Sequence, residues 1–325
     1  MLSRVASSVY WMTRYIERAE NIARFITVNL NLTLDFPAEV TRQWQPIVMA
    51  TGDHLLFEKK YGEDYSSENV IHFLALDQEY SNSIISSLRA ARENARSVRE
   101  IISSEMWEQV NRFYLELKEA STTDYASRNP HKFFKIITMR GHMFTGLLYS
   151  TMSHGEAFQF ALTGLLLERA DKTSRILDVK YFMLLPRAGE VNTPYDSIQW
   201  AAVLKSASAL EMYRKRFHQI IPKQVCDFLI FDSEFPRSIR YCLKKGEQAL
   251  HKISGTPVGT VSNPAEKSLG RLCADLDYSD IDETIAMGMH EYLDDLQVKI
   301  NTVGVHIHEA FFKVNASPTN GGASQ

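Results

Sequence analysis

Three charged residues recur with the same spacing at two places in the chain. The first set is Glu17, Glu20 and Arg24, and the second set is Glu168, Asp171 and Arg175. Carboxylates can act as general acids or bases, and they can also bind cations or pair with guanidinium groups. On a helix, spacings of three and four residues bring each set to one face, with an acid four residues before the arginine, the favourable order for an ion pair.

The segments around these residues also recur. Residues 17–28 return as 168–179, and residues 73–80 return as 228–235, at an offset of about 150 residues. This pattern predicts a tandem duplication of a helical unit.

We expect one repeat over residues 1–153 and a second over residues 154–314, packed on the first as one globular unit. The small polar residues of 315–325 predict a disordered tail.

Helical periodicity dominates the chain, and strand signals are almost absent. The first segment carries apolar residues that step alternately by four and three: Val5, Val9, Met12, Ile16, Ala19, Ala23, Ile26 and Leu30. Such a stripe predicts one long helix over about residues 4–33. A second long helix is expected from about Gly155 to Leu185. The predicted fold is therefore all-α, a multi-helix bundle of two tandem, pseudo-symmetric helical repeats.

Composition narrows the class of protein without naming a reaction. The chain has 325 residues, is 45% hydrophobic and carries a net charge of -3, which gives no bulk reason to expect nucleic acid or anionic lipid as a partner. The cysteines are odd in number and contain no CxxC pair, which favours reduced thiols in a cytoplasmic protein. No uncharged apolar run of 18 or more residues is present, so no transmembrane helix is expected.

The two charged sets are the candidate functional residues. The catalytic candidates are Glu17, Glu20, Glu168 and Asp171. The binding candidates are Arg14, Arg24, Arg175, Tyr10, Asn21, Arg96 and Arg99. Three interpretations remain open: ion pairs on helix surfaces, a buried network that joins the two repeats, or the lining of a shared pocket that binds a ligand or catalyses a reaction.

Neither a metal nor a cofactor is predicted. Diiron bundles use Glu-x-x-His, but here the residue three positions after Glu17 is Glu20, and the one after Glu168 is Asp171. An arginine in each set already neutralises the acids. The chain also has no GxGxxG, Walker-type loop, GxSxG or HExxH motif.

Several motifs together strongly resemble the bacterial alpha-E family of all-helical proteins, essentially from end to end. They lie at residues 2–6, 10–24, 93–100, Trp107 with Asn111, Phe158 and residues 167–171. Members of that family are typically encoded beside, or fused to, an ATP-grasp-like protein of the amide-ligase type, often near transglutaminase-like proteins. The family's signature glutamates would map onto Glu17, Glu20 and Glu168.

The resemblance implies a helical accessory or substrate-holding partner of an ATP-grasp-type peptide or amide ligase, and possibly of a transglutaminase-like protein. One alternative is an enzyme that uses Glu17 or Glu168 as a general base in a cavity between the repeats, which would require a raised carboxyl pKa. The other is a purely structural scaffold, which would expose a large apolar face and tolerate Glu17→Gln.

Overall fold

The computed structural model describes residues 1–35, 44–122, 125–184 and 194–313. Regular structure in these ranges is helical and includes no strand, so the predicted all-α class is confirmed. The first part of the chain forms α1 (Ser3–Asp35), α2 (Gln45–Thr51), α3 (His54–Tyr61), α4 (Ser67–Ile71), a π-helical turn (His72–Leu76), α5 (Ile84–Ser97), α6 (Ser104–Ser121), α7 (Tyr125–Arg128) and α8 (Pro130–Thr151).

The second part forms another series of helices. It consists of α9 (Glu156–Leu184), α10 (Pro194–Ser206), α11 (Leu210–Arg216), α12 (Pro222–Phe231), α13 (Ile239–Ser254), α14 (Pro264–Tyr278), α15 (Ile281–Met287), α16 (Met289–Ile307) and a π-helical turn (His308–Phe312). No described helix is both long enough and apolar enough to cross a membrane.

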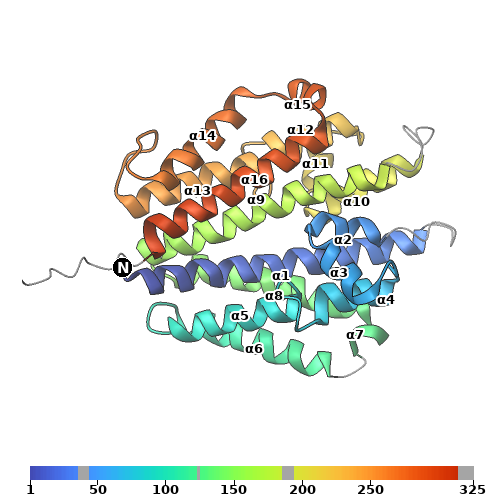
Figure 1. Cartoon of the computed structure of the whole chain (residues 1–325), viewed down its shortest axis with the longest axis horizontal. Helices are drawn as coiled ribbons and strands as arrows, with labels where there is room; N and C mark the ends of the chain where they lie inside the picture. The colour runs from blue at the N-terminus through green and yellow to red at the C-terminus, as the bar shows by residue number, and fades with distance from the viewer. Residues whose placement is uncertain (36–43, 123–124, 185–193, 314–325) are drawn as a thin grey trace, which may run out of the picture.

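The two longest helices, α1 and α9, lie side by side at the centre of the bundle (Figure 1). Helices α5 and α8 pack on α1, with α6 outside them, while α13 and α16 pack on α9, with α14 outside. The amino group of Met1 lies 3.0 Å from Glu156 Oε2, and Leu32 and Val179 line one pocket at the other end. The two central helices therefore run in the same direction.

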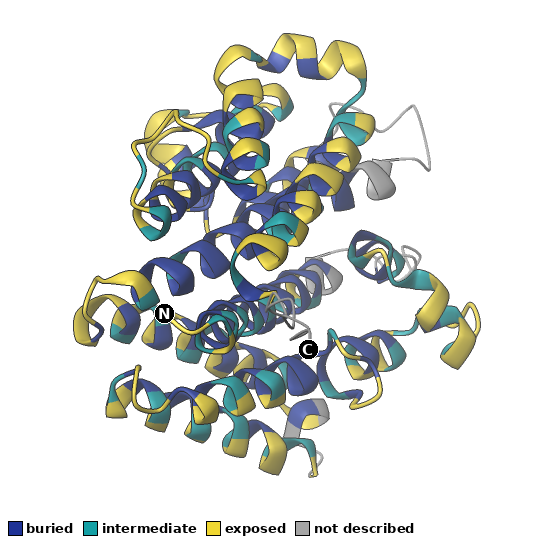
Figure 2. Cartoon of the chain, turned by 60° about the vertical axis from the view of Figure 1, so that its left-hand side comes forward, coloured by how far each residue is buried: buried dark blue, intermediate teal, exposed yellow. Residues whose placement is uncertain are grey.

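The apolar stripe predicted for the first helix explains its position. From Val9 to Ile26 every residue of the stripe is buried, and only Val5 and Leu30 at its ends are half-buried. Figure 2 shows the buried residues concentrated along the central helices, with the exposed ones on the outer layers. Buried apolar side chains from both parts of the chain form one continuous core, because a helix enclosed on several sides loses almost all contact with water.

Glycines separate two pairs of consecutive helices. Gly52, whose φ of 77° is left-handed, ends α2 shortly before α3 begins. Gly288, where φ is 103°, lies between α15 and α16.

The short helices cross between the two parts of the bundle. Helix α2 follows α1 in the chain but packs on α9, and α10 follows α9 but packs on α1. Trp44 lies just before α2 and Trp200 lies within α10, and both are buried. This crossed packing means that each long helix is held in place by a short helix from the other part of the chain.

Candidate functional site

A close contact between α1 and α9 fixes the position of the charged residues. Thr13 Oγ1 donates a hydrogen bond to the Ala161 carbonyl oxygen at 2.8 Å. A Cβ atom on Gly164 would lie only 2.4 Å from the Tyr10 carbonyl oxygen, so only glycine permits this separation of the two backbones. About one turn further along each helix, the charged side chains therefore face one another.

At this level, each helix carries a glutamate followed directly by an arginine, and the four side chains pair across the interface. Arg169 donates from Nε to Glu17 Oε1 at 2.9 Å and from Nη2 to Oε2 at 3.0 Å. Arg18 donates from Nε to Glu168 Oε1 at 2.7 Å and from Nη2 to Oε2 at 3.1 Å. We call these two bidentate interactions the reciprocal pairs, because each helix supplies the acid of one and the base of the other.

Further donors complete the coordination of Glu17. Arg237 Nη1 lies 2.7 Å from Glu17 Oε1, and the Asn21 side-chain amide donates to the same oxygen at 3.0 Å. The second nitrogen of the Arg237 guanidinium, Nη2, lies 2.6 Å from Glu20 Oε1. Arg237 thus joins the two acids of α1.

Glu168 is surrounded in the same way. Arg14 Nε donates to Glu168 Oε2 at 2.8 Å, and Lys172 Nζ lies 3.5 Å from Oε1. Arg14 Nη1 also donates to the Tyr10 hydroxyl oxygen at 2.9 Å. With Arg18, which contacts both of its oxygens, the carboxylate of Glu168 therefore pairs with three basic side chains.

The second acid in each set pairs with the arginine four residues later, as the spacing predicts. Glu20 Oε1 accepts from Arg24 Nη2 and lies 3.2 Å from His142 Nε2. Asp171 Oδ2 accepts from Arg175 Nε at 3.0 Å and from Lys172 Nζ at 2.9 Å. These pairs lie within one helix, whereas the reciprocal pairs join two helices.

Arg175 and Arg24 also reach the ends of the crossed short helices. Arg175 Nη1 donates to the carbonyl oxygens of Ala50 at 3.1 Å and Thr51 at 3.2 Å, at the C-terminal end of α2. Arg24 Nη1 donates to the Ser208 hydroxyl just after α10. A cation at a helix C-terminus satisfies free carbonyl groups and interacts favourably with the helix dipole.

Two similar turns place further polar groups beside the long helices. Asp77 Oδ1 accepts from the Glu79 backbone N–H at 2.9 Å, and Asp232 Oδ1 accepts from the Glu234 N–H at 2.8 Å. The first turn leads to Asn82, which accepts from Arg18 Nη1 at 2.6 Å. The second leads to Arg237. The segments 73–80 and 228–235, which are similar in sequence, thus form the same kind of turn with the same aspartate hydrogen bond.

The four acids are buried and the bases around them are buried or half-buried, so the interpretation as simple surface ion pairs is wrong. The residues Glu17, Glu20, Glu168 and Asp171 are at most 4% exposed. We call these four acids, with the bases around them, the buried charged network. Its bases are Arg14, Arg18, Arg24, Arg169, Lys172, Arg175 and Arg237.

Ion pairing overrides burial in setting the protonation of the acids. Burial alone would raise the pKa of Glu17, but Arg169 and Arg237 hold it well below its usual value. Burial opposes ionisation of Glu168 and Asp171 as well, and Arg18, Lys172 and Arg175 lower the pKa of these carboxyls. All three acids are therefore ionised at neutral pH and bind a proton poorly.

The arrangement suits neither metal binding nor general base catalysis. In the part of the chain that the structure describes, no group of three or more His, Cys, Asp or Glu side chains could hold a metal ion. A general base near neutral pH needs a raised carboxyl pKa and access to a substrate proton. The carboxylates of Glu17 and Glu168 have a lowered pKa and are already occupied by guanidinium groups.

Five of the predicted binding residues belong to the buried charged network or contact it directly: Tyr10, Arg14, Asn21, Arg24 and Arg175. The other two lie elsewhere. Arg96 is exposed and pairs with Glu93 on α5, and Arg99 stacks over the Trp107 ring with its Cζ 4.9 Å from the ring centroid.

Sequence reasoning missed three arginines of the network: Arg18, Arg169 and Arg237. The first two are identical positions of the repeated segments and could have been found by asking which repeated charges lack a partner on their own helix. Arg237 has no charged counterpart in the first part of the chain, because Asn82 occupies the equivalent position after the first turn. No sequence signal points to it.

Comparison with curated proteins and with solved structures finds no match. A family model matches residues 1–312; it is named Alpha-E and is described as a predicted alpha-helical domain with a conserved ER motif. The dipeptide Glu-Arg occurs twice in this chain, at residues 17–18 and 168–169, and these are the four residues of the reciprocal pairs. The chain belongs to the Alpha-E family.

Proposed function

We propose that the protein is a non-catalytic helical partner of an ATP-grasp-type peptide or amide ligase. In this proposal, the buried charged network stabilises the fold of the protein. The observation that carries the proposal is the state of the four acids: they are buried, ionised and each paired with arginine or lysine side chains. Groups in that state stabilise a structure rather than exchange protons with a substrate.

The proposal includes the duplication predicted from the sequence, with repeats over residues 1–153 and 154–314. Its support lies in paired features: the reciprocal pairs, the crossed contacts of α2 and α10, and the two aspartate turns. Each feature has a counterpart about 150 residues away. An ancestral unit of this kind would have its long helix packed on that of a second copy.

An exposed apolar face supports a role in binding another protein. Helix α8 presents Ile136, Met139 and Met143 to solvent, and the latter two are 57% and 49% exposed. These residues follow one another at helical spacings of three and four. Large apolar side chains that gather on one exposed face often mark a protein interaction site, and methionines adapt readily to a partner.

Co-expression with the ATP-grasp-like protein that the family resemblance implies tests the proposal. We expect the two proteins to co-purify and to elute together in size-exclusion chromatography. Met139→Glu should abolish the complex while leaving the circular dichroism spectrum and melting temperature unchanged, because the residue is exposed. Tyr278→Glu, another exposed position, serves as the control. Failure of the wild-type proteins to form a complex would overturn the ligase assignment.

A further inference from the structure

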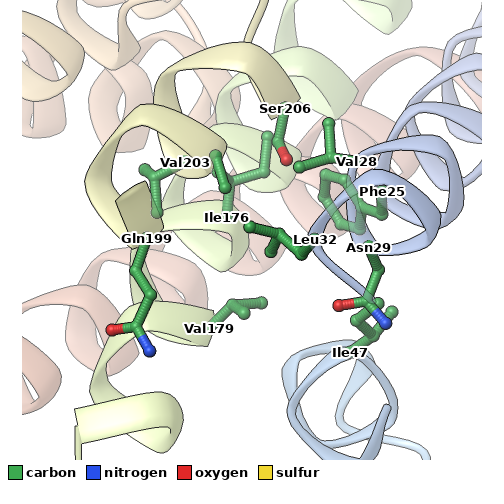
Figure 3. A pocket seen from close by; sticks show the side chains of 11 residues that line it. Phe25, Val28, Asn29, Leu32, Ile47, Ile176, Val179, Gln199, Val203 and Ser206 are labelled. Atoms are coloured by element: carbon green, nitrogen blue, oxygen red, sulfur yellow. The ribbon is translucent and has the colours of Figure 1, made fainter. Parts of the chain in front are cut away.

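Two open spaces in the fold differ greatly in size. The space between α1, α9, α2 and α10, shown in Figure 3, measures about 30 Å³ and has mostly apolar walls. A space of that size holds a water molecule or two and no larger ligand. A groove in the outer layer of the second part of the chain measures about 880 Å³. Sites for small molecules measure about 300–1,000 Å³, so the groove is large enough for a ligand.

The groove runs between α14 and α16, which pack against each other. Figure 1 shows the chain passing from α14 to α15 and returning along α16, so the two helices are antiparallel. Near the C-terminal end of α14, Asp275 Oδ2 lies 3.0 Å from Lys299 Nζ. His306, two turns further along α16, is therefore level with the first turns of α14. From Pro264 to Asp275 the groove follows α14 for about 16 Å, at 1.5 Å per residue.

Basic side chains outnumber acidic ones along the groove. Among its described lining residues, three carry a permanent positive charge and one carries a negative charge: Lys267, Arg271, Lys299 and Asp275. The ion pair of Asp275 with Lys299 neutralises one end. Lys267 and Arg271 are exposed, and neither pairs with an acid in the described parts of the chain. The other end of the groove therefore presents two unpaired positive charges.

The acid next to these cations in the sequence is held away from the groove. Glu266 is 1% exposed and is not among the residues that line the groove. Its carboxylate accepts a hydrogen bond from Ser262 Oγ at 2.8 Å and another from Thr256 Oγ1 at 2.9 Å. Glu266 thus fixes the loop before α14 and leaves Lys267 and Arg271 without a contacting acid.

We propose that this groove binds a small molecule that carries a phosphate group, with the phosphate between Lys267 and Arg271. Residues four apart on a helix have Cβ atoms about 5–6 Å apart, so one anion contacts both side chains. A phosphate monoester carries a charge of about -1.5 to -2 at neutral pH and three acceptor oxygens, which match an ammonium and a guanidinium group together. A carboxylate supplies one charge only. Val261 and Leu272 offer apolar surface to the body of the ligand. This inference is independent of the ligase partnership.

Three probes test the inference: phenyl phosphate, inorganic phosphate and benzoate. The measurement is isothermal titration calorimetry of the full-length protein at low ionic strength, because salt screens exposed charges. We expect phenyl phosphate to bind most tightly. Inorganic phosphate should bind several times more weakly, since it lacks an apolar body, and benzoate should bind most weakly, since it carries one charge.

Substitution of the two cations locates the site. Arg271→Gln should weaken the binding of phenyl phosphate about tenfold, because a hydrogen bond between two charged groups is lost. Lys267→Gln should have a similar effect, and the double variant should not bind. Arg112→Gln, at an exposed position on α6, is the matched control and should bind as wild type does. All of these positions are exposed, so the circular dichroism spectrum and melting temperature should not change.

Several results would overturn the proposal. One is an equal affinity of wild type and Arg271→Gln for phenyl phosphate, and another is the absence of binding at millimolar concentrations. Benzoate or inorganic phosphate that binds as tightly as phenyl phosphate would exclude an organic phosphate as the ligand. Binding of a serine-phosphorylated peptide without binding of phenyl phosphate would replace the small molecule by a protein partner.

Discussion

Removing one acid of the reciprocal pairs should destabilise the protein more than any surface charge change. In Glu17→Gln, the guanidinium groups of Arg169 and Arg237 stay buried but lose the carboxylate that accepts three of their hydrogen bonds at 2.7–3.0 Å. Breaking a buried ion pair by removing one partner costs about 3–5 kcal/mol, because the other charge is left uncompensated. A domain of ordinary stability has about 5–15 kcal/mol in total, so the loss is large.

The assay is urea unfolding followed by circular dichroism, with a double-mutant cycle. Glu17→Gln and Arg169→Gln are measured alone and together, and we expect a coupling energy of about 1–3 kcal/mol. Glu93→Gln provides the control: its carboxylate is 44% exposed and pairs with arginines on the surface, so the change should be within about 0.5 kcal/mol. If Glu17→Gln does not fold, Arg169→Lys keeps the charge but loses the bidentate geometry, and the cycle is measured from that variant.

The same experiment separates architecture from catalysis. A catalytic Glu17 would leave stability nearly unchanged on substitution by glutamine and would abolish an activity. An architectural Glu17 lowers the midpoint of unfolding without changing any activity of the protein that remains folded. A cost below about 1 kcal/mol, together with a coupling energy under about 0.5 kcal/mol, would refute our reasoning about the reciprocal pairs.

Three further outcomes are expected. Gly164→Ala should lower the free energy of unfolding in urea by about 2 kcal/mol or more, because the added Cβ would meet the backbone of α1. Gly146→Ala, whose Cβ would meet nothing within 4 Å, should be neutral or stabilising. Equal effects of the two changes would contradict the close contact of α1 and α9. Glu17 and Glu168 have a lowered pKa in the folded protein, so their contribution to the free energy of unfolding is complete above the unfolded pKa near 4.5. That contribution is lost as the pH falls below 4.5, by about 1.4 kcal/mol per pH unit for each group. A free energy of unfolding that stays constant down to pH 3 would exclude this. All three cysteines are buried, and burial raises the pKa of Cys242 to about 12, so a thiol reagent such as DTNB should react with them only after unfolding; rapid reaction of the native protein would show that the core opens.

Local periodicity predicted the elements of the fold well. The stripe from Val5 to Leu30 predicted α1 to within a residue or two at each end, and the pairs Glu20–Arg24 and Asp171–Arg175 form as their spacing indicates. These features depend only on neighbouring turns of one helix, so the sequence contains all the information that they require.

Long-range partners were harder to predict. Nothing within α9 indicates that Arg175 reaches the carbonyl groups at the end of α2, because that contact depends on the crossed packing of the short helices. Whether the acids were exposed or buried was open for the same reason. Burial of α1 on every side results from layers contributed by α5, α8, α9 and α10, and no single segment of the sequence specifies those layers.

The geometry of the helix also explains why a Glu-Arg dipeptide should occur on both long helices. Adjacent residues of a helix point about 100° apart, and here Glu17 and Arg18 each pair with a residue of another element and not with each other. Two parallel helices that carry the dipeptide at the same level satisfy all four groups at once, since each glutamate meets the other helix's arginine. With the first copy alone, Glu17 would keep Arg237 and Asn21, but Arg18 would keep only the Asn82 side-chain oxygen and would have no acid beside it. The two copies therefore complement each other, and loss of either one should destabilise the same interface.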